Sequence, residues 1–128
     1  EEIVRSLGSI IYHCQPEKHD RAVSWISHLP VMVSASLMAA CLGETDPEIF
    51  QLAQNLASSG FRDTSRVGAG NPELGVMMAQ YNRQALINSL HQYRQNLDIF
   101  INVIEQENWE VLEQKLKLNQ QNRPKFVE

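Results

Sequence analysis

The sequence predicts a mainly helical domain with a kinked central helix, preceded by the last helix and strand of an α/β domain. Asp46-Pro47 and Asn71-Pro72 each place proline directly after a capping residue, which is typical of a helix N-terminus. Apolar residues recur at helical spacing over most of the chain, and one short run near the N-terminus reads as a strand. A chain of 128 residues can form one compact domain.

The first residues read as the end of a different domain. Residues 1–7 resemble the last turns of a helix, and Gly8 is a suitable C-cap. Residues 9–14, SIIYHC, are a β-branched and aromatic run typical of a buried strand. A lone strand cannot satisfy its backbone N–H and C=O groups, and no second strand is predicted. We therefore assign residues 1–15 to the tail of an α/β domain whose remainder is absent, and residues 16–128 to the helical domain.

Residues 20–42 predict a central helix. They are apolar on most sides, which is typical of a buried helix. Pro30 lies inside it and lacks the N–H that would bond to the carbonyl of Ile26. We therefore expect a kink or a division into two helices at this point, and a C-terminus at Gly43.

Further helices are expected over residues 46–57, from Pro72 onward, and after Asn108, with a loop over residues 58–71. The helix that begins at Pro72 is predicted to be long. It carries an apolar stripe with spacings of 4, 3, 4, 3 and 4 residues: Leu86, Leu90, Tyr93, Leu97, Phe100 and Ile104. Such a stripe must pack against another apolar surface, which belongs either to another helix of the same chain or to a second subunit.

The overall charge and composition exclude several classes of partner. A net charge of −4 without a basic cluster argues against nucleic acid and against an anionic membrane surface. The apolar run Leu29–Leu42 is shorter than the ~20 residues of a bilayer span, and the N-terminus lacks the layout of a signal peptide. The two cysteines lie in apolar segments, which predicts free, buried thiols and a cytoplasmic protein.

Polar side chains interrupt the apolar central helix at His19, Asp20, Ser27 and His28. Each buried polar atom costs about 1–3 kcal/mol unless it finds a partner, so this segment is a candidate functional surface. The structural alternatives are that Asp20 stabilises a helix N-terminus through the dipole and that His28 is a core histidine with a satisfied hydrogen bond.

A second polar segment is GFRDTSR, residues 60–66, which places Arg62, Asp63 and Arg66 next to a glycine. Guanidinium groups suit carboxylates because two parallel charge-assisted hydrogen bonds fix the orientation of the ligand. The alternative is a surface ion pair with Asp63.

Two kinds of site are not expected. His13, Cys14, His19 and His28 match no zinc-ligand spacing, so we predict no metal site. A serine hydrolase site is also poorly supported, because the adjacent Ser27 and His28 diverge on a helix and no nucleophile elbow is present.

Taken in order, these segments resemble the C-terminal half of prephenate/arogenate dehydrogenases. The matching segments are His19-Asp20, Ser27 to Pro30, Gly60 to Arg66 and Asn71 to Glu73. WISHLPVMVSASL and LAQNLASSGFRDTSRVGAGNPELG are most similar to the cyanobacterial type of arogenate dehydrogenase, and the resemblance covers essentially the whole chain.

The resemblance implies an oxidoreductase of tyrosine biosynthesis, which converts arogenate to tyrosine by oxidative decarboxylation. Such enzymes join an N-terminal Rossmann domain to an all-helical dimerisation domain, and the substrate lies between the two. Residues 1–15 would then close the Rossmann sheet. The cofactor implied is NADP, with NAD as the alternative. No GxGxxG motif is present, and the catalytic base is expected in the absent N-terminal domain, so the chain alone should be inactive.

The resemblance also implies roles for individual residues. Arg66 matches an arginine that binds a substrate carboxylate, reaching into the partner subunit's site. Ser27 and His28 match residues that line the nicotinamide and ring pocket, so Ser27 is also a cofactor-binding candidate. His19 matches another histidine near the substrate, and Arg62 with Asp63 matches a supporting charged pair.

Two positions depart from the family pattern. Val31 stands where many prephenate-using relatives have a histidine after SHLP, which favours arogenate. Gly75 stands where relatives often carry a tryptophan. The alternatives to the arogenate assignment are a prephenate-specific dehydrogenase that uses NAD and a non-catalytic helical dimerisation module.

Overall fold

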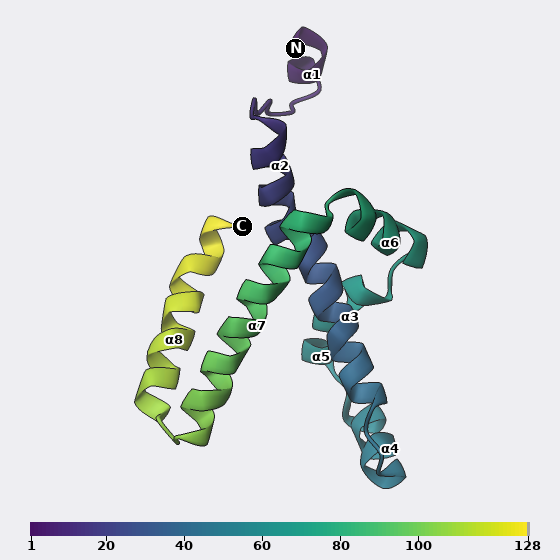
Figure 1. Ribbon diagram of the computed structural model, residues 1–128, viewed down its shortest axis with the longest axis vertical. Coiled ribbons are helices and arrows are strands. Elements are labelled where there is room, and N and C mark those ends of the chain that lie inside the picture. The colour runs from purple at the N-terminus through teal and green to yellow at the C-terminus, as the bar shows by residue number, and fades with distance from the viewer. Residues whose placement is uncertain (128) are drawn as a thin grey trace. The chain divides into compact units, whose positions relative to one another are not determined.

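The computed structural model describes residues 1–127, in which helices are joined by short turns and no strand forms (Figure 1). In chain order the elements are α1 (Glu2–Ser6), α2 (Pro16–Val23), η1 (Ser24–His28), α3 (Leu29–Leu42), α4 (Pro47–Leu56), α5 (Ser59–Ser65), η2 (Arg66–Ala69), α6 (Pro72–Tyr81), α7 (Arg83–Glu105), α8 (Trp109–Asn122) and η3 (Arg123–Lys125). The chain divides into two compact units, one up to Ser89 and one from Leu90.

The N-terminal segment confirms the predicted helix end but not the predicted strand. Gly8 has φ 74°, and the Ser9 N–H donates to the Val4 carbonyl at 3.3 Å, which is a Schellman C-cap. Residues 9–15 have no regular structure, and Ile10 is 75% exposed. The strand prediction is wrong because a strand needs a neighbour for its N–H and C=O groups, and residues 1–127 supply none.

The central helix is present as α2, η1 and α3, which follow one another along a single rod in Figure 1. The predicted interruption next to Pro30 is confirmed, because a π-helical turn stands directly before α3. Ser24, Leu29 and Ser34 are the buried side chains of this rod. The small serine side chains allow other segments to approach it closely.

The helix α4 begins as predicted, because the Asp46 carboxylate accepts hydrogen bonds from the N–H groups of Glu48 and Ile49. The loop expected over residues 58–71 is mostly wrong. Residues 59–65 form α5 and residues 66–69 form the 3₁₀ turn η2, and both contact α3. Glycines and serines lower the helix propensity of this segment, but packing against α3 overrides that preference.

The helix predicted from Pro72 onward is divided. Asn71 caps α6 as expected by accepting from the Glu73 and Leu74 N–H groups. At Asn82 the backbone leaves helical geometry, with φ −125° and ψ 37°, and α7 begins at Arg83. The first turns of α7 bury Leu86 and Ser89 in the first unit.

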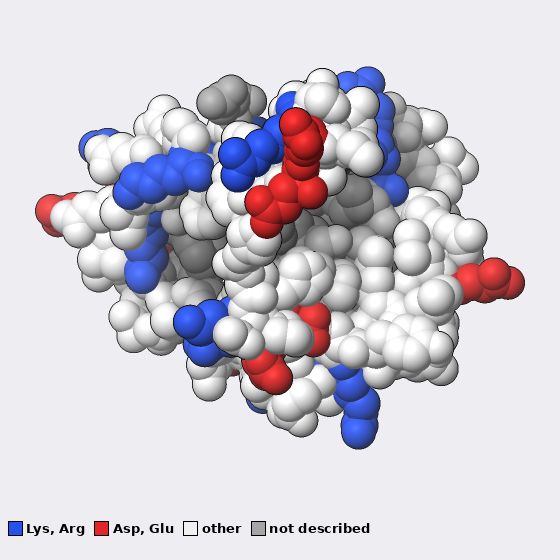
Figure 2. Space-filling view, turned by 90° about the horizontal axis from the view of Figure 1, so that it is seen from above, with Lys and Arg blue, Asp and Glu red and all other residues white. Residues whose placement is uncertain are grey.

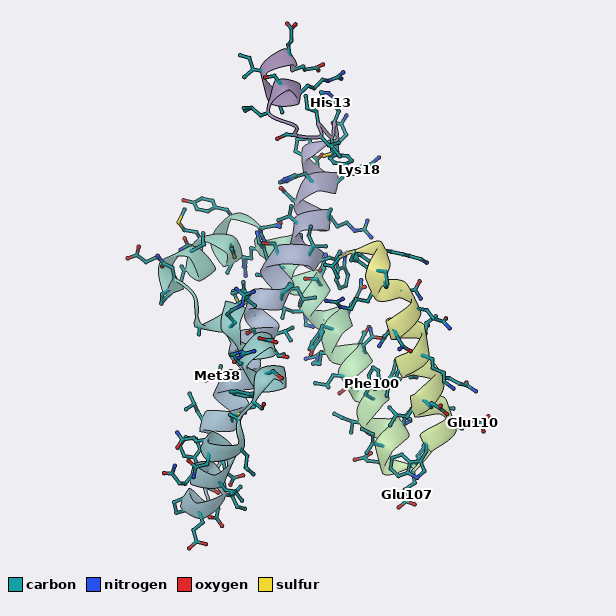
Figure 3. All side chains as sticks on the ribbon, turned by 180° about the vertical axis from the view of Figure 1, so that it is seen from behind. His13, Lys18, Met38, Phe100, Glu107 and Glu110 are labelled. Atoms are coloured by element: carbon teal, nitrogen blue, oxygen red, sulfur yellow. The ribbon has the colours of Figure 1, made fainter. Side chains whose placement is uncertain are left out.

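In the second unit, α8 returns along the last turns of α7 (Figure 1). The reversal is a second Schellman motif, in which the Asn108 N–H donates to the Val103 carbonyl and the Glu107 N–H donates to the Ile104 carbonyl, both at 3.0 Å. Glu107, which Figure 3 labels at this turn, has φ 52°, a conformation that favours glycine. Asn108 also caps α8, as predicted.

The chain buries few apolar side chains. Among residues 1–127 the buried hydrophobic residues are Leu29, Leu86 and Val103. Half of the α7 stripe stays exposed: Tyr93 by 39%, Leu97 by 48% and Ile104 by 49%. Cys14 and Cys41 are free, as predicted, but both are exposed rather than buried.

Candidate functional site

Ser27 and His28 lie on the π-helical turn η1, and both are half-buried. The Leu29 N–H donates to the carbonyl of Ser24, five residues back, instead of the usual four. Because Pro30 has no N–H, a regular α-helical ladder cannot pass this point, and the wider turn accommodates the defect. Single π-helical turns of this kind are frequent at functional sites.

Asn82 connects this turn to the start of the rod. Its Nδ2 atom donates to the backbone carbonyl of Asp20 at 2.7 Å and lies 3.2 Å from Nδ1 of His28. Asn82 stands between α6 and α7, so one amide ties this junction to α2 and η1, which lie more than fifty positions earlier in the sequence.

His19 and Asp20 lie on α2, where Nδ1 of His19 is 3.1 Å from the Asp20 carboxylate. Both side chains are more than half exposed, at 62% and 55%. The pair is joined to His28 through the Asp20 carbonyl and Asn82, so three of the four predicted polar positions in this segment share one network.

The second polar segment folds into α5 and η2. Arg62 pairs with the adjacent Asp63, with Nε 3.2 Å from the carboxylate, as expected for the structural alternative. Arg66 is the first residue of η2 and is exposed, and its guanidinium forms no ion pair or hydrogen bond with any residue between 1 and 127. The Arg66 guanidinium therefore has its hydrogen-bonding capacity available for an anion.

The turn that carries Arg66 is held against the central rod. The buried Ser34 hydroxyl accepts a hydrogen bond from the Gly68 N–H at 2.8 Å. A Cβ on Gly68 would lie within 2.5 Å of the Ser34 carbonyl carbon and would collide with the backbone of Ala35. Only glycine allows this close approach.

A cavity of about 390 Å³ lies between α3, η2 and α6. Its lining includes Val31, three residues after His28, and Val67, directly after Arg66. Gly75 lines the cavity from α6, so both positions that depart from the family pattern face this cavity. Ser27, His28 and Arg66 are not among its lining residues, and no hydrogen bond within residues 1–127 joins Arg66 to either of the other two.

A larger, apolar cavity of about 570 Å³ is formed by the end of α3 together with α4 and α5. Met38 of α3, labelled in Figure 3, lines it together with Phe50 and Phe61. Its walls carry few polar atoms, so it suits another apolar segment rather than a charged small molecule.

Within residues 1–127, no group of three or more His, Cys, Asp or Glu side chains is placed to hold a metal ion. The stretch Pro16–Leu42 is long and apolar enough to cross a membrane, although central helices of soluble proteins can be equally long and apolar. Figure 2 shows Lys, Arg, Asp and Glu side chains of both signs interspersed on the face it presents.

Asn82 and Ser34 are site residues that sequence reasoning missed. An asparagine between two apolar helical segments is a signal for a helix break, because its side chain competes for backbone groups. Ser34 has no such signal, because a serine in an apolar helix does not reveal from which remote N–H its hydroxyl accepts a hydrogen bond.

Comparisons with known proteins agree with this architecture. The family model for the prephenate dehydrogenase dimerization domain matches residues 15–118. The crystal structure of Synechocystis arogenate dehydrogenase is 58% identical, with a TM-score of 0.95 over 98% of this chain and 45% of that chain. Prephenate dehydrogenase of Bacillus subtilis (strain 168) is 25% identical over 112 residues, which are 88% of this chain and 30% of that protein.

A more distant structure supports the fold alone. Prephenate dehydrogenase from A. aeolicus, in complex with hydroxyphenyl propionate and NAD+, is 22% identical with a TM-score of 0.84, covering 97% of this chain and 43% of that one. The chain thus spans less than half the length of these relatives. The match over residues 15–118 shows that this chain belongs to the prephenate dehydrogenase dimerization domain family.

Proposed function

We propose that this chain is the helical, C-terminal part of an arogenate dehydrogenase, which oxidises and decarboxylates arogenate to tyrosine with NADP. The observation that carries the proposal is the 58% identity with Synechocystis arogenate dehydrogenase over 98% of the chain. The alternative substrate and cofactor are prephenate and NAD. The more distant relatives are named prephenate dehydrogenases, and the A. aeolicus structure contains NAD+.

The chain's own contribution is to bind and orient the substrate. Arogenate carries a ring carboxylate and an amino-acid side chain, and the ring becomes aromatic when hydride and carbon dioxide leave. The exposed Arg66 guanidinium suits a bidentate contact with a carboxylate. By the family resemblance, His28 and Ser27 are assigned to the ring and nicotinamide pocket and His19 to its edge, while the Arg62–Asp63 pair supports the turn.

Two residues of the smaller cavity support arogenate over prephenate. Val31 and Gly75 make its wall apolar and open at the positions where relatives carry histidine and tryptophan. A histidine donor at that position suits the side-chain keto oxygen of prephenate, whereas arogenate carries an ammonium group there, so loss of the donor disfavours prephenate.

The nicotinamide supplies hydride acceptance when it is bound, but the described residues do not form a dinucleotide site. The one Gly-x-Gly sequence, Gly68 to Gly70, follows a helix rather than a strand. Its first glycine faces the backbone of α3, so no space remains there for a phosphate. Ser27 contributes one hydroxyl at the edge of the cofactor, and an N-terminal domain binds the rest.

The chain acts as a homodimer through its helical surface. Its exposed apolar residues include Ile26, Leu52, Leu97 and Trp109, with exposed fractions of 68%, 56%, 48% and 57%. Burying apolar surface contributes about 25 cal/mol per Å², so packing a second copy against these exposed residues stabilises the dimer. The apolar character of Pro16–Leu42 has the same explanation.

Steady-state kinetics of the full-length protein test this proposal. Arogenate and prephenate are each measured with NADP and with NAD. The proposal predicts the highest kcat/KM for arogenate with NADP. A preference for prephenate with NAD would establish the alternative enzyme, and a dimer without activity on any combination would identify a non-catalytic module.

A further inference from the structure

Asn82 makes two polar contacts with a single atom. Its Nδ2 lies 2.7 Å from the Asp20 carbonyl oxygen and 3.2 Å from His28 Nδ1. An amide NH₂ group carries two hydrogens, so it can donate to both groups at once.

The first contact fixes the orientation of the amide. A backbone carbonyl oxygen only accepts hydrogen bonds, so the side-chain atom 2.7 Å from it must be the NH₂ group rather than the amide oxygen. Rotating the amide by 180° would place two acceptors against each other. The atom that faces His28 is therefore a donor.

The second contact then determines the tautomer of His28. Nδ1 must accept the hydrogen bond from Asn82, so it carries no proton, and the proton of the neutral ring resides on Nε2. We propose that Asn82 holds His28 as the neutral Nε2–H tautomer, which makes His28 a fixed hydrogen-bond donor for an oxygen of the bound ligand. Asn82 is thus a positioning residue that acts through His28.

This tautomer restricts what His28 can do. Nε2 is protonated, so it binds a carboxylate, hydroxyl or carbonyl oxygen and cannot accept a proton from the substrate. The assignment of this oxygen to arogenate rests on the proposed function, whereas the assignment of the His28 tautomer does not.

Nitrogen NMR of the 128-residue chain tests the tautomer directly. The chain has only four histidines, which are labelled with ¹⁵N at both ring nitrogens. The His28 signals are assigned because they disappear in the His28→Gln variant. At neutral pH we expect its Nδ1 to resonate in the range of an unprotonated ring nitrogen and its Nε2 in the range of a protonated one. The reverse pattern, or a rapidly averaged pair of tautomers, would overturn the inference.

Asn82→Asp tests the link to binding. A carboxylate at position 82 only accepts hydrogen bonds, so it loses the contact with the Asp20 carbonyl, favours a proton on His28 Nδ1 and should reverse the His28 pattern. In the full-length enzyme, loss of the Nε2–H donor to a charged oxygen should raise the KM for arogenate about tenfold or more, with the KM for NADP unchanged.

Asn108→Asp is the matched control, since Asn and Asp cap helices equally well and Asn108 lies at the α8 N-terminus. It should change neither the His28 spectrum nor the KM for arogenate. Reversal of the tautomer by Asn82→Asp without a change in KM would contradict the binding role. A wild-type enzyme inactive on arogenate would instead refute the proposed function while leaving the tautomer result intact.

Discussion

Gly68→Ala perturbs the closest approach in the first unit. The added Cβ would lie within 2.5 Å of the Ser34 carbonyl carbon and 2.7 Å from its hydroxyl oxygen, and it would collide with the Ala35 backbone. Most of these atoms belong to the backbone of α3, so no flexible side chain can move aside. The turn η2 must shift away, and the hydrogen bond from the Gly68 N–H to Ser34 must lengthen.

The cost of this shift can be estimated from its parts. Overpacking a tight contact costs about 1–3 kcal/mol, and losing a hydrogen bond costs about 1 kcal/mol. The free energy of unfolding should therefore fall by about 2–4 kcal/mol, which corresponds to a drop in Tm of about 7–15 °C for a chain of this size. Ser34→Ala removes only the acceptor and should cost about 1–3 kcal/mol.

Thermal unfolding followed by circular dichroism provides the assay, at one fixed protein concentration because dimers unfold in a concentration-dependent way. Gly60→Ala is the control: it lies in α5 with nothing within 4 Å of its Cβ, and alanine should stabilise that helix by about 0.5–1 kcal/mol. Equal effects of the two glycine substitutions would refute the docking of η2 on α3. The double variant Ser34→Ala/Gly68→Ala completes the comparison. If its loss of unfolding free energy equals the sum of the losses in the two single variants, the two positions are energetically independent.

Three other predictions concern local structure and assembly. Asp46→Ala removes the α4 cap and should lower the free energy of unfolding by about 1 kcal/mol in urea titrations. Glu107→Gly relieves a positive φ and should raise it by about 0.5–1 kcal/mol in the same titrations, and a loss would contradict the turn geometry. Leu97→Asp places a charge on the exposed stripe and should yield monomers by sedimentation velocity, whereas the neighbouring Gln95→Asp should remain dimeric.

Local signals predicted much of the helical architecture. The starts of α4, α6 and α8 follow from capping residues whose side chains bond to nearby N–H groups, and such bonds depend on a few adjacent residues. The interruption next to Pro30 is equally local, because a missing N–H disrupts the helix in any surroundings.

The errors arose where distant contacts decide the structure. The segment 58–71 contains weak helix formers, but contacts with α3 stabilise α5 and η2. Residues 9–14 have strand propensity, yet no neighbouring strand exists within residues 1–127 to pair with them. The break at Asn82 depends on hydrogen bonds to Asp20 and His28, which lie more than fifty positions earlier.

The candidate site was predictable in its residue types but not in its connections. Arg66, Ser27 and His28 stand out in the sequence as polar groups in unusual surroundings. The structure places Arg66 on an exposed turn and the other two on a π-helical turn. Ser34 and Asn82, which hold these turns in place, carry neither charge nor motif. Their roles depend on tertiary geometry alone.

The central claim is that the Arg66 guanidinium binds a carboxylate of the substrate. The most direct test is the KM of the full-length Arg66→Ala enzyme for arogenate and for NADP. Losing a bidentate, charge-assisted contact of about 2–4 kcal/mol should raise the KM for arogenate by about 30-fold or more and leave that for NADP within about twofold, while Arg66→Lys recovers only part of the loss. Equal increases for both ligands, or none, would contradict the account.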